Sequence, residues 1–508
     1  MRSNVISPVV IKLIVLASFI VICAGLIWQA IILSNSVPFH DWDEAIYAQV
    51  AKEFVSHPGI TLRYNGAYWF EKPPLLAWYY GLAWVLPFSH ELGARLLSAF
   101  LSIGSLLMVY ALSRKYFAGK LVSLLALLVC LQSAMFIDRS ILVNVDMMLT
   151  FGWLLYLWGA TSNKNIFRFF GLIVGVLSKS LLGFIPLVVE ILLDIVSRRY
   201  TLRKLYFHSV CLAIGSIWYF VMLVLHGKIF LISHFYDHLI SRVVRPIELH
   251  FGGRMFYVEK LWHETGIIML VACIGMSIFL IRVIRRRKVG SISKLYVVAV
   301  ALAYFLVLTL SKAKLHWYIT PLIPLIGIGT ASVFENIIHS RSLLLRFAAY
   351  ASFIGLSLFC IVQFTRSVLF IPQGWYIPTE KTRIAQCIRP LLTSRKTPSR
   401  ILYLVPPQQR KDAQVIEAAK LQIGSSFVYG SAPAFVYYVD KPVSFYYAPS
   451  KLYADWQNTK VDTFGAIVLD EADLFDPLMQ EITSTWNTNT PGIPKCSFGS
   501  LRAFVRDN

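Results

Sequence analysis

Three acidic residues follow the first long apolar run of this 508-residue chain. Asp41, Asp43 and Glu44 come soon after residues 9–33, which are long enough to cross a hydrocarbon core of about 30 Å. Acids at such a boundary are costly unless water, a cation or a substrate proton compensates them. Because a carboxylate can take the proton of a hydroxyl nucleophile, the first loop is a candidate reaction site at a membrane surface.

A second charged pair, Glu71 and Lys72, lies further along the same loop. Pro73 and Pro74 follow this pair and favour the start of a helix. Free backbone N–H groups at a helix start attract phosphate, so Lys72 is a candidate phosphate ligand. We expect the loop, residues 34–91, to lie outside the membrane and to carry amphipathic surface helices.

Simpler interpretations of both clusters remain open. The Asp41-Trp42-Asp43 spacing, or Glu71, could supply oxygen ligands to a divalent cation. Asp43 could instead cap the helix that follows it, favoured by the helix dipole. Glu71 and Lys72 could form a surface ion pair of little energetic value.

The composition is that of a polytopic α-helical membrane protein. Hydrophobic residues make up 57% of the chain and charged residues only 15%, whereas a soluble protein carries about 25% charged residues. Apolar runs of roughly 17–25 residues recur and predict about eleven transmembrane helices. The expected spans are 9–33, 92–113, 119–137, 146–161, 166–178, 180–196, 205–226, 264–284, 293–311, 315–335 and 343–366.

The loop charges orient the expected bundle. Basic residues gather in alternate loops such as 114–120 and 198–204, which the positive-inside rule places in the cytoplasm with the N-terminus. The first loop and the C-terminal segment then lie outside, which is the periplasm if this is a bacterial inner membrane. The net charge of +21 fits contacts with anionic membrane lipids. Nucleic acid is excluded as a partner because no soluble basic domain is present to hold it.

The character of the chain changes after the last span. We expect a transmembrane domain over residues 1–370 and a small extracytoplasmic α/β domain over residues 371–508. Short strands are predicted at 401–405, 426–429, 442–446 and 466–469. Cys387 and Cys496 lie outside the apolar spans and could pair if this domain is in an oxidising compartment.

A series of motifs, in order along residues 40–325, resembles the protein O-mannosyltransferase superfamily. The closer match is the bacterial branch that contains the undecaprenyl-phosphate aminoarabinose transferases of lipid A. The motifs are Asp43–Ala48, Tyr68–Leu75, Ala94-Arg95, Leu142–Asp146, Leu177–Pro186, Asp237–Arg242 and Ser311–Pro321. The chain departs from the family where Ser180 replaces a glycine after Lys179, and where Asp237 replaces a glutamate.

The resemblance implies a GT-C-type helical bundle and transfer of a sugar from a polyprenyl-phosphate donor at the outer face of the membrane. It implies Asp43 as general base, with Asp146 positioning Asp43 or the acceptor. The residues implied to bind the donor phosphate or the substrates are Tyr47, Glu71, Lys72, Lys179, Arg242, Lys314 and Tyr318. The acceptor could be lipid A, another glycolipid, a polysaccharide or a protein, so sugar and acceptor stay open.

Two other classes of function compete with this one. A transporter or flippase of lipid-linked intermediates would need charges through the membrane midplane and paired repeats or broken helices. The charges gather at one edge instead, and no repeat is evident. A non-catalytic lipid-binding scaffold would tolerate the loss of both Asp43 and Lys72.

Overall fold

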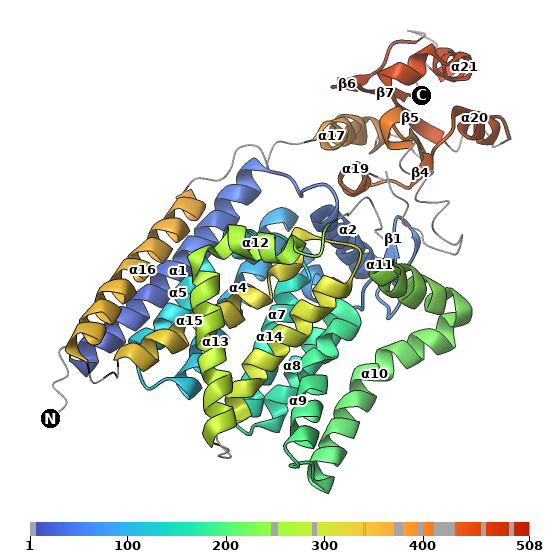
Figure 1. The fold of residues 1–508 in the computed structure, drawn as a ribbon. Helices are drawn as coiled ribbons and strands as arrows, with labels where there is room; N and C mark the ends of the chain where they lie inside the picture. The colour runs from blue at the N-terminus through green and yellow to red at the C-terminus, as the bar shows by residue number, and fades with distance from the viewer. Residues whose placement is uncertain are drawn as a thin grey trace.

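The computed structural model has two parts, a helical bundle that ends at Leu369 and a smaller α/β unit beyond it (Figure 1). It describes residues 7–244, 252–286, 292–338, 340, 342–369, 379–393, 400–410, 432–458, 464–486 and 492–506. The α/β unit lies over the end of the bundle that carries α2 (Asp43–Ser56) and the hairpin of β1 (Leu62–Tyr64) and β2 (Ala67–Trp69).

The bundle is built from apolar helices of very different lengths. Its remaining helices are α1 (Pro8–Ser36), α3 (Leu75–Tyr80), α4 (His90–Tyr116), α5 (Lys120–Leu131), α6 (Ala134–Ile141), α7 (Asp146–Thr161), α8 (Asn165–Lys179), α9 (Ile185–Val196), α10 (Leu202–Phe230), the π-helix η3 (Leu231–Ile240), α11 (Ser241–Val244), α12 (Phe256–Thr265), α13 (Ile267–Arg286), α14 (Ile292–Leu310), α15 (Leu322–Ile338) and α16 (Leu343–Leu369).

The predicted count of about eleven transmembrane helices is not confirmed. Five helices in the described residues are long and apolar enough to cross a membrane, or seven if each of two bent pairs is one span. The bends are 80° between α5 and α6 and 106° between α12 and α13, so a continuous apolar run in the sequence is not one straight helix. α15 and the apolar part of α14 are shorter than 18 residues.

The α/β unit contains a five-stranded sheet in the order β4-β3-β5-β7-β6. β3 (Arg400–Leu404) runs parallel to β4 (Val443–Tyr446) and to β5 (Phe464–Asp470), whereas β7 (Leu501–Val505) is antiparallel to β5 and to β6 (Cys496–Phe498). β3, β4 and β5 correspond to the strands predicted at 401–405, 442–446 and 466–469. The strand predicted at 426–429 lies outside the described residues.

Helices cover both faces of this sheet. α17 (Glu380–Thr393) and α19 (Pro433–Val439) pack on one face, in a core that also contains buried residues of α2 and α3. α20 (Pro449–Asn458) and α21 (Pro477–Trp486) pack on the other face. The hydrophobic core that supports the first loop is therefore continuous with the core of the α/β unit.

Polar contacts also join the first loop to the α/β unit. The Phe39 backbone N–H donates to the Tyr438 hydroxyl at 2.6 Å, and Lys52 forms an ion pair with Asp440. The Asn65 amide exchanges two hydrogen bonds with the backbone of Val443, at 2.7 and 3.1 Å. These contacts fix the α/β unit against the loop that carries Asp43.

A disulfide bond joins Cys387 of α17 to Cys496 of β6 and closes a loop of 109 residues. We expect the double variant Cys387→Ser/Cys496→Ser to lose about 2–5 kcal/mol of stability in the α/β unit, because the open chain gains conformational freedom on unfolding. Limited proteolysis of the full-length protein checks this, with faster cleavage expected beyond residue 380. Cys273→Ser, at an exposed free cysteine, is the control. Equal cleavage rates would show that the bond adds no stability.

Candidate active site

A cavity of about 330 Å³ opens at the end of the bundle beneath the first loop. Five of the predicted residues line it, namely Glu71, Lys72, Lys179, Arg242 and Tyr318. The remaining polar lining is Ser180, His234, His238 and Ser311, and the apolar lining is Leu181, Leu182, Ile185, Leu239, Val243, Val307 and Leu308. Charged and apolar side chains therefore share one cavity, which suits an amphipathic lipid phosphate.

Two cations of the cavity, Lys179 and Arg242, contact Tyr318. The Lys179 ammonium lies 4.1 Å from the centre of the Tyr318 ring. The Arg242 guanidinium donates to the Tyr318 hydroxyl at 3.0 Å. Lys179 also pairs with Asp146, and both side chains of this pair are buried. These contacts pre-arrange positive charge with little freedom to reorganise, which favours stabilisation of a leaving phosphate.

Asp43 lies half-buried at the start of α2, surrounded by charged groups. Burial raises the pKa of its carboxyl group. Arg139, Lys72 and Arg242 act in the opposite direction, whereas Asp146 raises the pKa further. Among the described residues no side chain forms an ion pair with Asp43, so its carboxylate is not consumed by a structural contact. A raised pKa and a free carboxylate are what a general base requires.

Glu44, the residue after Asp43, anchors this part of the loop. Its carboxylate accepts two hydrogen bonds from the Arg95 guanidinium, at 3.0 and 2.8 Å, and both side chains are almost fully buried. Arg95 also donates to the carbonyls of Val37 and Pro38. The acid that looked like a second reactive group thus fixes the chain on either side of Asp43.

Tyr47 lies one turn after Asp43 on α2 and is buried, with its ring 6.4 Å from that of Trp69. Burial, followed by the nearby charges of Asp43 and Asp146, raises its pKa well above the ordinary value. Its phenol therefore stays protonated and can donate a hydrogen bond. Tyr47 thus lies close to Asp43, and its contact with substrate stays a prediction.

A sharp turn places Lys179 and Ser180 at the cavity. The chain leaves α8 at Ser180 with φ 58°, and the next residues pack back on α8. A Cβ at Gly183 would lie 2.2 Å from the Val176 nitrogen, so only glycine permits this close approach. The Ser180 hydroxyl contacts His234 Nε2 at 2.9 Å.

His234 is a cavity residue that the sequence analysis did not single out, whereas His238 belongs to the Asp237–Arg242 motif. His238 Nε2 lies 3.3 Å from the Glu71 carboxylate, and His234 Nδ1 lies 2.7 Å from the Phe70 carbonyl oxygen. Both histidines belong to the π-helix η3, which also leads to Arg242. Positions 234, 238 and 242 are spaced four residues apart, so they lie on one face of a helix. This spacing is the sequence signal that could have linked His234 to His238 and Arg242.

Glu71 and Lys72 have strongly shifted pKa values. Burial alone would raise the pKa of Glu71, but His238, Lys72 and Arg242 outweigh it and lower the pKa to about 2. Burial and the charge of Arg242 lower the pKa of Lys72 to about 8, although Glu71 opposes this. Glu71 therefore stays ionised at all ordinary pH values, while Lys72 loses its charge in mildly alkaline solution.

Two of the predicted site residues lie elsewhere. Lys314 donates to the carbonyls of Leu308 and Thr309, at 2.7 and 2.9 Å, and so caps the end of α14. Asp41 points to the α/β unit, where it lies 3.3 Å from the Lys381 ammonium. The separate contacts of Asp41 argue against a cation held jointly with Asp43. Glu71 remains a candidate metal ligand. Among the described cavity residues, His238 is the one side chain close to Glu71 that could also bind a metal ion.

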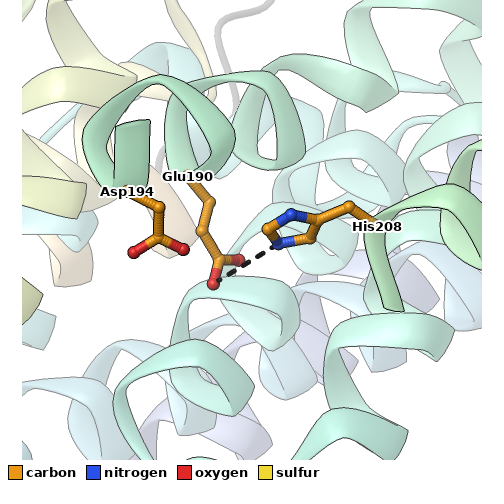
Figure 2. Close-up of side chains that lie close together, drawn as sticks. All are labelled: Glu190, Asp194 and His208. Atoms are coloured by element: carbon orange, nitrogen blue, oxygen red, sulfur yellow. Dashed lines mark ion pairs between the residues drawn. The ribbon is translucent and has the colours of Figure 1, made fainter. Parts of the chain in front are cut away.

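A group with metal-ligand chemistry lies away from this cavity (Figure 2). Glu190 and Asp194 project from α9 toward His208 of α10, and their ligand atoms lie within 4.8 Å of one another. Arg168 pairs with Glu190, and Lys204 lies 2.6 Å from Asp194. Because each carboxylate already has its own cation, we assign this group to the packing of α8, α9 and α10.

Comparison with known proteins gives a consistent result. A family model described as dolichyl-phosphate-mannose-protein mannosyltransferase matches residues 71–226. The structure resembles ArnT from Cupriavidus metallidurans bound to undecaprenyl phosphate, with a TM-score of 0.66 at 17% identity over 96% of this chain and 97% of that chain. The apo state of that ArnT gives a TM-score of 0.67 at 16% identity, with the same coverage.

A more distant likeness covers the apo form of the Archaeoglobus fulgidus oligosaccharyltransferase, with a TM-score of 0.53 at 13% identity over 90% of this chain and 70% of that chain. No curated protein sequence matches the chain. The predicted resemblance to the protein O-mannosyltransferase superfamily is thus confirmed, and the chain has the GT-C fold of ArnT over nearly its whole length.

Proposed function

We propose that this protein is a membrane glycosyltransferase that moves a sugar from a polyprenyl-phosphate donor to a hydroxyl-bearing acceptor. The observation that carries the proposal is the cavity in which Lys72, Lys179, Arg242 and Tyr318 face an apolar wall, with Asp43 within electrostatic reach of Lys72 and Arg242. The cations suit the phosphate, the apolar wall suits the first isoprene units, and the carboxylate suits the acceptor proton.

The proposed reaction is a single displacement at the anomeric carbon. The acceptor oxygen forms a bond to that carbon while its proton passes to the Asp43 carboxylate. The bond between the anomeric carbon and the phosphate oxygen breaks, and its electron pair stays with the polyprenyl phosphate. Lys72, Lys179 and Arg242 stabilise the charge that develops on the leaving phosphate, so a general acid is not needed. Asp146 orients Lys179 through their ion pair.

We further propose that the reaction takes place on the outer face of a bacterial inner membrane. In the predicted topology, the basic loops lie on the side of the membrane opposite to the first loop. This distribution supports a cytoplasmic N-terminus. The disulfide between Cys387 and Cys496 supports an oxidising compartment for the α/β unit. The variant Ser450→Cys and a membrane-impermeant thiol reagent test this orientation. The new cysteine should be labelled in intact spheroplasts. An absence of labelling would contradict the proposed orientation.

The function itself is tested with purified protein in lipid vesicles. Supplied with polyprenyl-phosphate sugars and glycolipid acceptors, the protein should release polyprenyl phosphate and form a glycosylated acceptor in equal amounts. Movement of the donor across the bilayer without cleavage would instead establish a transporter. Binding of the donor with neither cleavage nor movement would establish a scaffold.

The shifted pKa values predict a bell-shaped pH profile of kcat/KM. Asp43 must be ionised to act as a base, and burial raises its pKa, so the acidic limb should lie above the ordinary carboxyl range near about 4. Lys72 must be protonated to bind phosphate, so the rate should fall as the pH rises through about 8. Lys72→Arg should move the alkaline limb upward because arginine keeps its charge. Lys52→Arg is the control, and an alkaline limb that Lys72→Arg leaves in place would exclude Lys72 as its cause.

A further inference from the structure

Ser180 has a backbone conformation that is unusual for a serine. Its φ and ψ angles are 58° and −139°, in a region that glycine occupies readily and that other residues avoid because of steric clashes. The motif that this segment resembles has a glycine here, so the turn itself does not need a side chain. Strain of this kind persists where the surrounding structure holds it, and it is often found at functional sites. The Ser180 hydroxyl is therefore expected to have a role of its own.

The Ser180 hydroxyl lies in the middle of a chain of hydrogen bonds. It contacts His234 Nε2 at 2.9 Å and accepts a hydrogen bond from the Tyr219 hydroxyl at 3.0 Å. His234 Nδ1 lies 2.7 Å from the Phe70 carbonyl oxygen. Ser180 and His234 are both buried. The chain of bonds thus runs from α10, through the turn at Ser180 and through η3, to the segment that precedes Glu71.

The Phe70 carbonyl fixes the direction of the bonds in this chain. A carbonyl oxygen only accepts, so His234 Nδ1 carries the proton. Burial disfavours a charged imidazolium, and the neutral ring has its acceptor at Nε2, to which the Ser180 hydroxyl donates. We call this bond the Ser180–His234 tether. It carries no net charge, and both ring nitrogens of the histidine have a partner.

The Ser180–His234 tether joins the segments that carry the cations of the donor cavity. Lys179 directly precedes Ser180, and Arg242 follows His234 by eight residues. Lys72 comes two residues after the carbonyl group that His234 binds. The three cations repel one another, since Arg242 and Lys179 both act against the charge of Lys72. A neutral tether opposes this repulsion without adding a charge of its own.

The helix η3 is of a kind that needs external restraints. It is a π-helix of ten residues, whereas π-helices in proteins occur mostly as single turns. Beyond its end, the Arg242 carbonyl accepts hydrogen bonds from the Ser311 hydroxyl and from the Ala313 backbone N–H, both at 2.9 Å. In its first half, His234 is held by both ring nitrogens. The Ser180–His234 tether and the bonds at Arg242 thus fix η3 at two points.

Resting on the proposed function, we propose that Ser180 and His234 are positioning residues for the donor phosphate. Their hydrogen bond holds Lys72, Lys179 and Arg242 at a fixed spacing, so that the three cations meet one phosphate group together. The tether acts through these cations, because the Ser180 proton is already donated to His234. Its loss should weaken binding of the phosphate group and leave binding of the apolar chain unchanged.

Binding of undecaprenyl phosphate and of undecaprenol to the full-length protein, compared by native mass spectrometry, tests this inference. Ser180→Ala and Ser180→Gly should bind the phosphate at least about tenfold more weakly and should bind undecaprenol as the unaltered protein does. Because glycine also relieves the backbone strain, a loss shared by both variants isolates the hydroxyl.

Ser178→Ala is the matched control for this comparison. The Ser178 hydroxyl is also buried, but it bonds to the Gly175 carbonyl of its own helix at 2.9 Å, so its loss should change neither affinity. Undiminished affinity of both Ser180 variants for undecaprenyl phosphate would overturn the inference. An equal loss of affinity for undecaprenol would also overturn it, because this would show general damage to the cavity.

Hydrogen exchange without any ligand tests the tether separately from the proposed function. The backbone amides of η3 should exchange at least about tenfold faster in Ser180→Ala and in His234→Phe. The double variant should exchange no faster than either single variant, since both remove the same bond. Unchanged or additive exchange rates would show that no tether exists, even in a protein that binds the donor. Faster exchange in a protein that binds no undecaprenyl phosphate would instead refute the proposed function, and the role of the tether in donor binding with it.

Discussion

The Asp43→Asn variant is expected to transfer sugar about 10²–10⁴ times more slowly than the unaltered protein, because a positioned general base contributes a factor of this size. Asparagine keeps the shape and the polarity of the side chain, but it cannot accept the acceptor proton at neutral pH. The loss should appear in kcat, measured as polyprenyl phosphate released from a lipid-linked sugar. The acidic limb of the pH profile should disappear with it.

Two controls separate a lost base from a damaged fold. Glu53→Gln lies on the same helix, where Glu53 accepts hydrogen bonds from the backbone of Asn65 and Gly66, and it should keep nearly full activity. Binding of undecaprenyl phosphate to Asp43→Asn should be unchanged or tighter, because a negative charge near the phosphate is removed. Activity close to that of the unaltered protein would show that Asp43 is not the general base, and no other residue is proposed for that role.

The first loop shows how far the sequence could predict the site. The charge clusters and the proline pair identified Asp43, Lys72 and Glu71 because acids and lysines at a membrane edge are rare without a function. The motif order added Lys179, Arg242 and Tyr318, which lie far apart in the chain and yet line one cavity with Lys72. Their roles stay predictions until they are measured.

Other assignments could not be made from sequence because they depend on the tertiary partner. Glu44 looks as reactive as Asp43, but a buried arginine fifty-one positions away neutralises it. Lys314 matches a motif position, but its ammonium donates hydrogen bonds to the carbonyls at the end of α14. Asp41 belongs to the same short cluster, but its contacts are with the α/β unit. No local pattern encodes these partners.

The number of transmembrane spans was hard to predict from the sequence for a different reason. Hydropathy identifies apolar runs, but it does not show where a run bends, as between α5 and α6 and between α12 and α13. Broken helices are tolerated at membrane depth where their free backbone groups are buried in protein or line a polar cavity. The break at Ser180 lies at the cavity. The predicted spans 166–178 and 180–196 already separate at this break, which places Lys179 at the cavity.

The Lys179→Met variant is expected to lose both stability and activity, for separable reasons. Removing one partner of a buried ion pair leaves Asp146 uncompensated and should cost about 3–5 kcal/mol of stability. Removing a cation that stabilises the leaving phosphate should also slow transfer about 10²–10³-fold. The second variant Lys179→Met/Asp146→Asn removes the stranded charge, so it should recover thermal stability without recovering transfer.

Arg168→Met provides the matched control for this prediction. Arg168 forms a buried ion pair with Glu190, like that of Lys179 with Asp146, but it lies away from the cavity. The Arg168→Met variant should have its thermal stability lowered by a similar amount, while each folded molecule keeps its rate of transfer. If Lys179→Met/Asp146→Asn regained both stability and transfer, Lys179 would be a structural residue. The phosphate would then depend on Lys72 and Arg242 alone, and the removal of either should abolish donor binding.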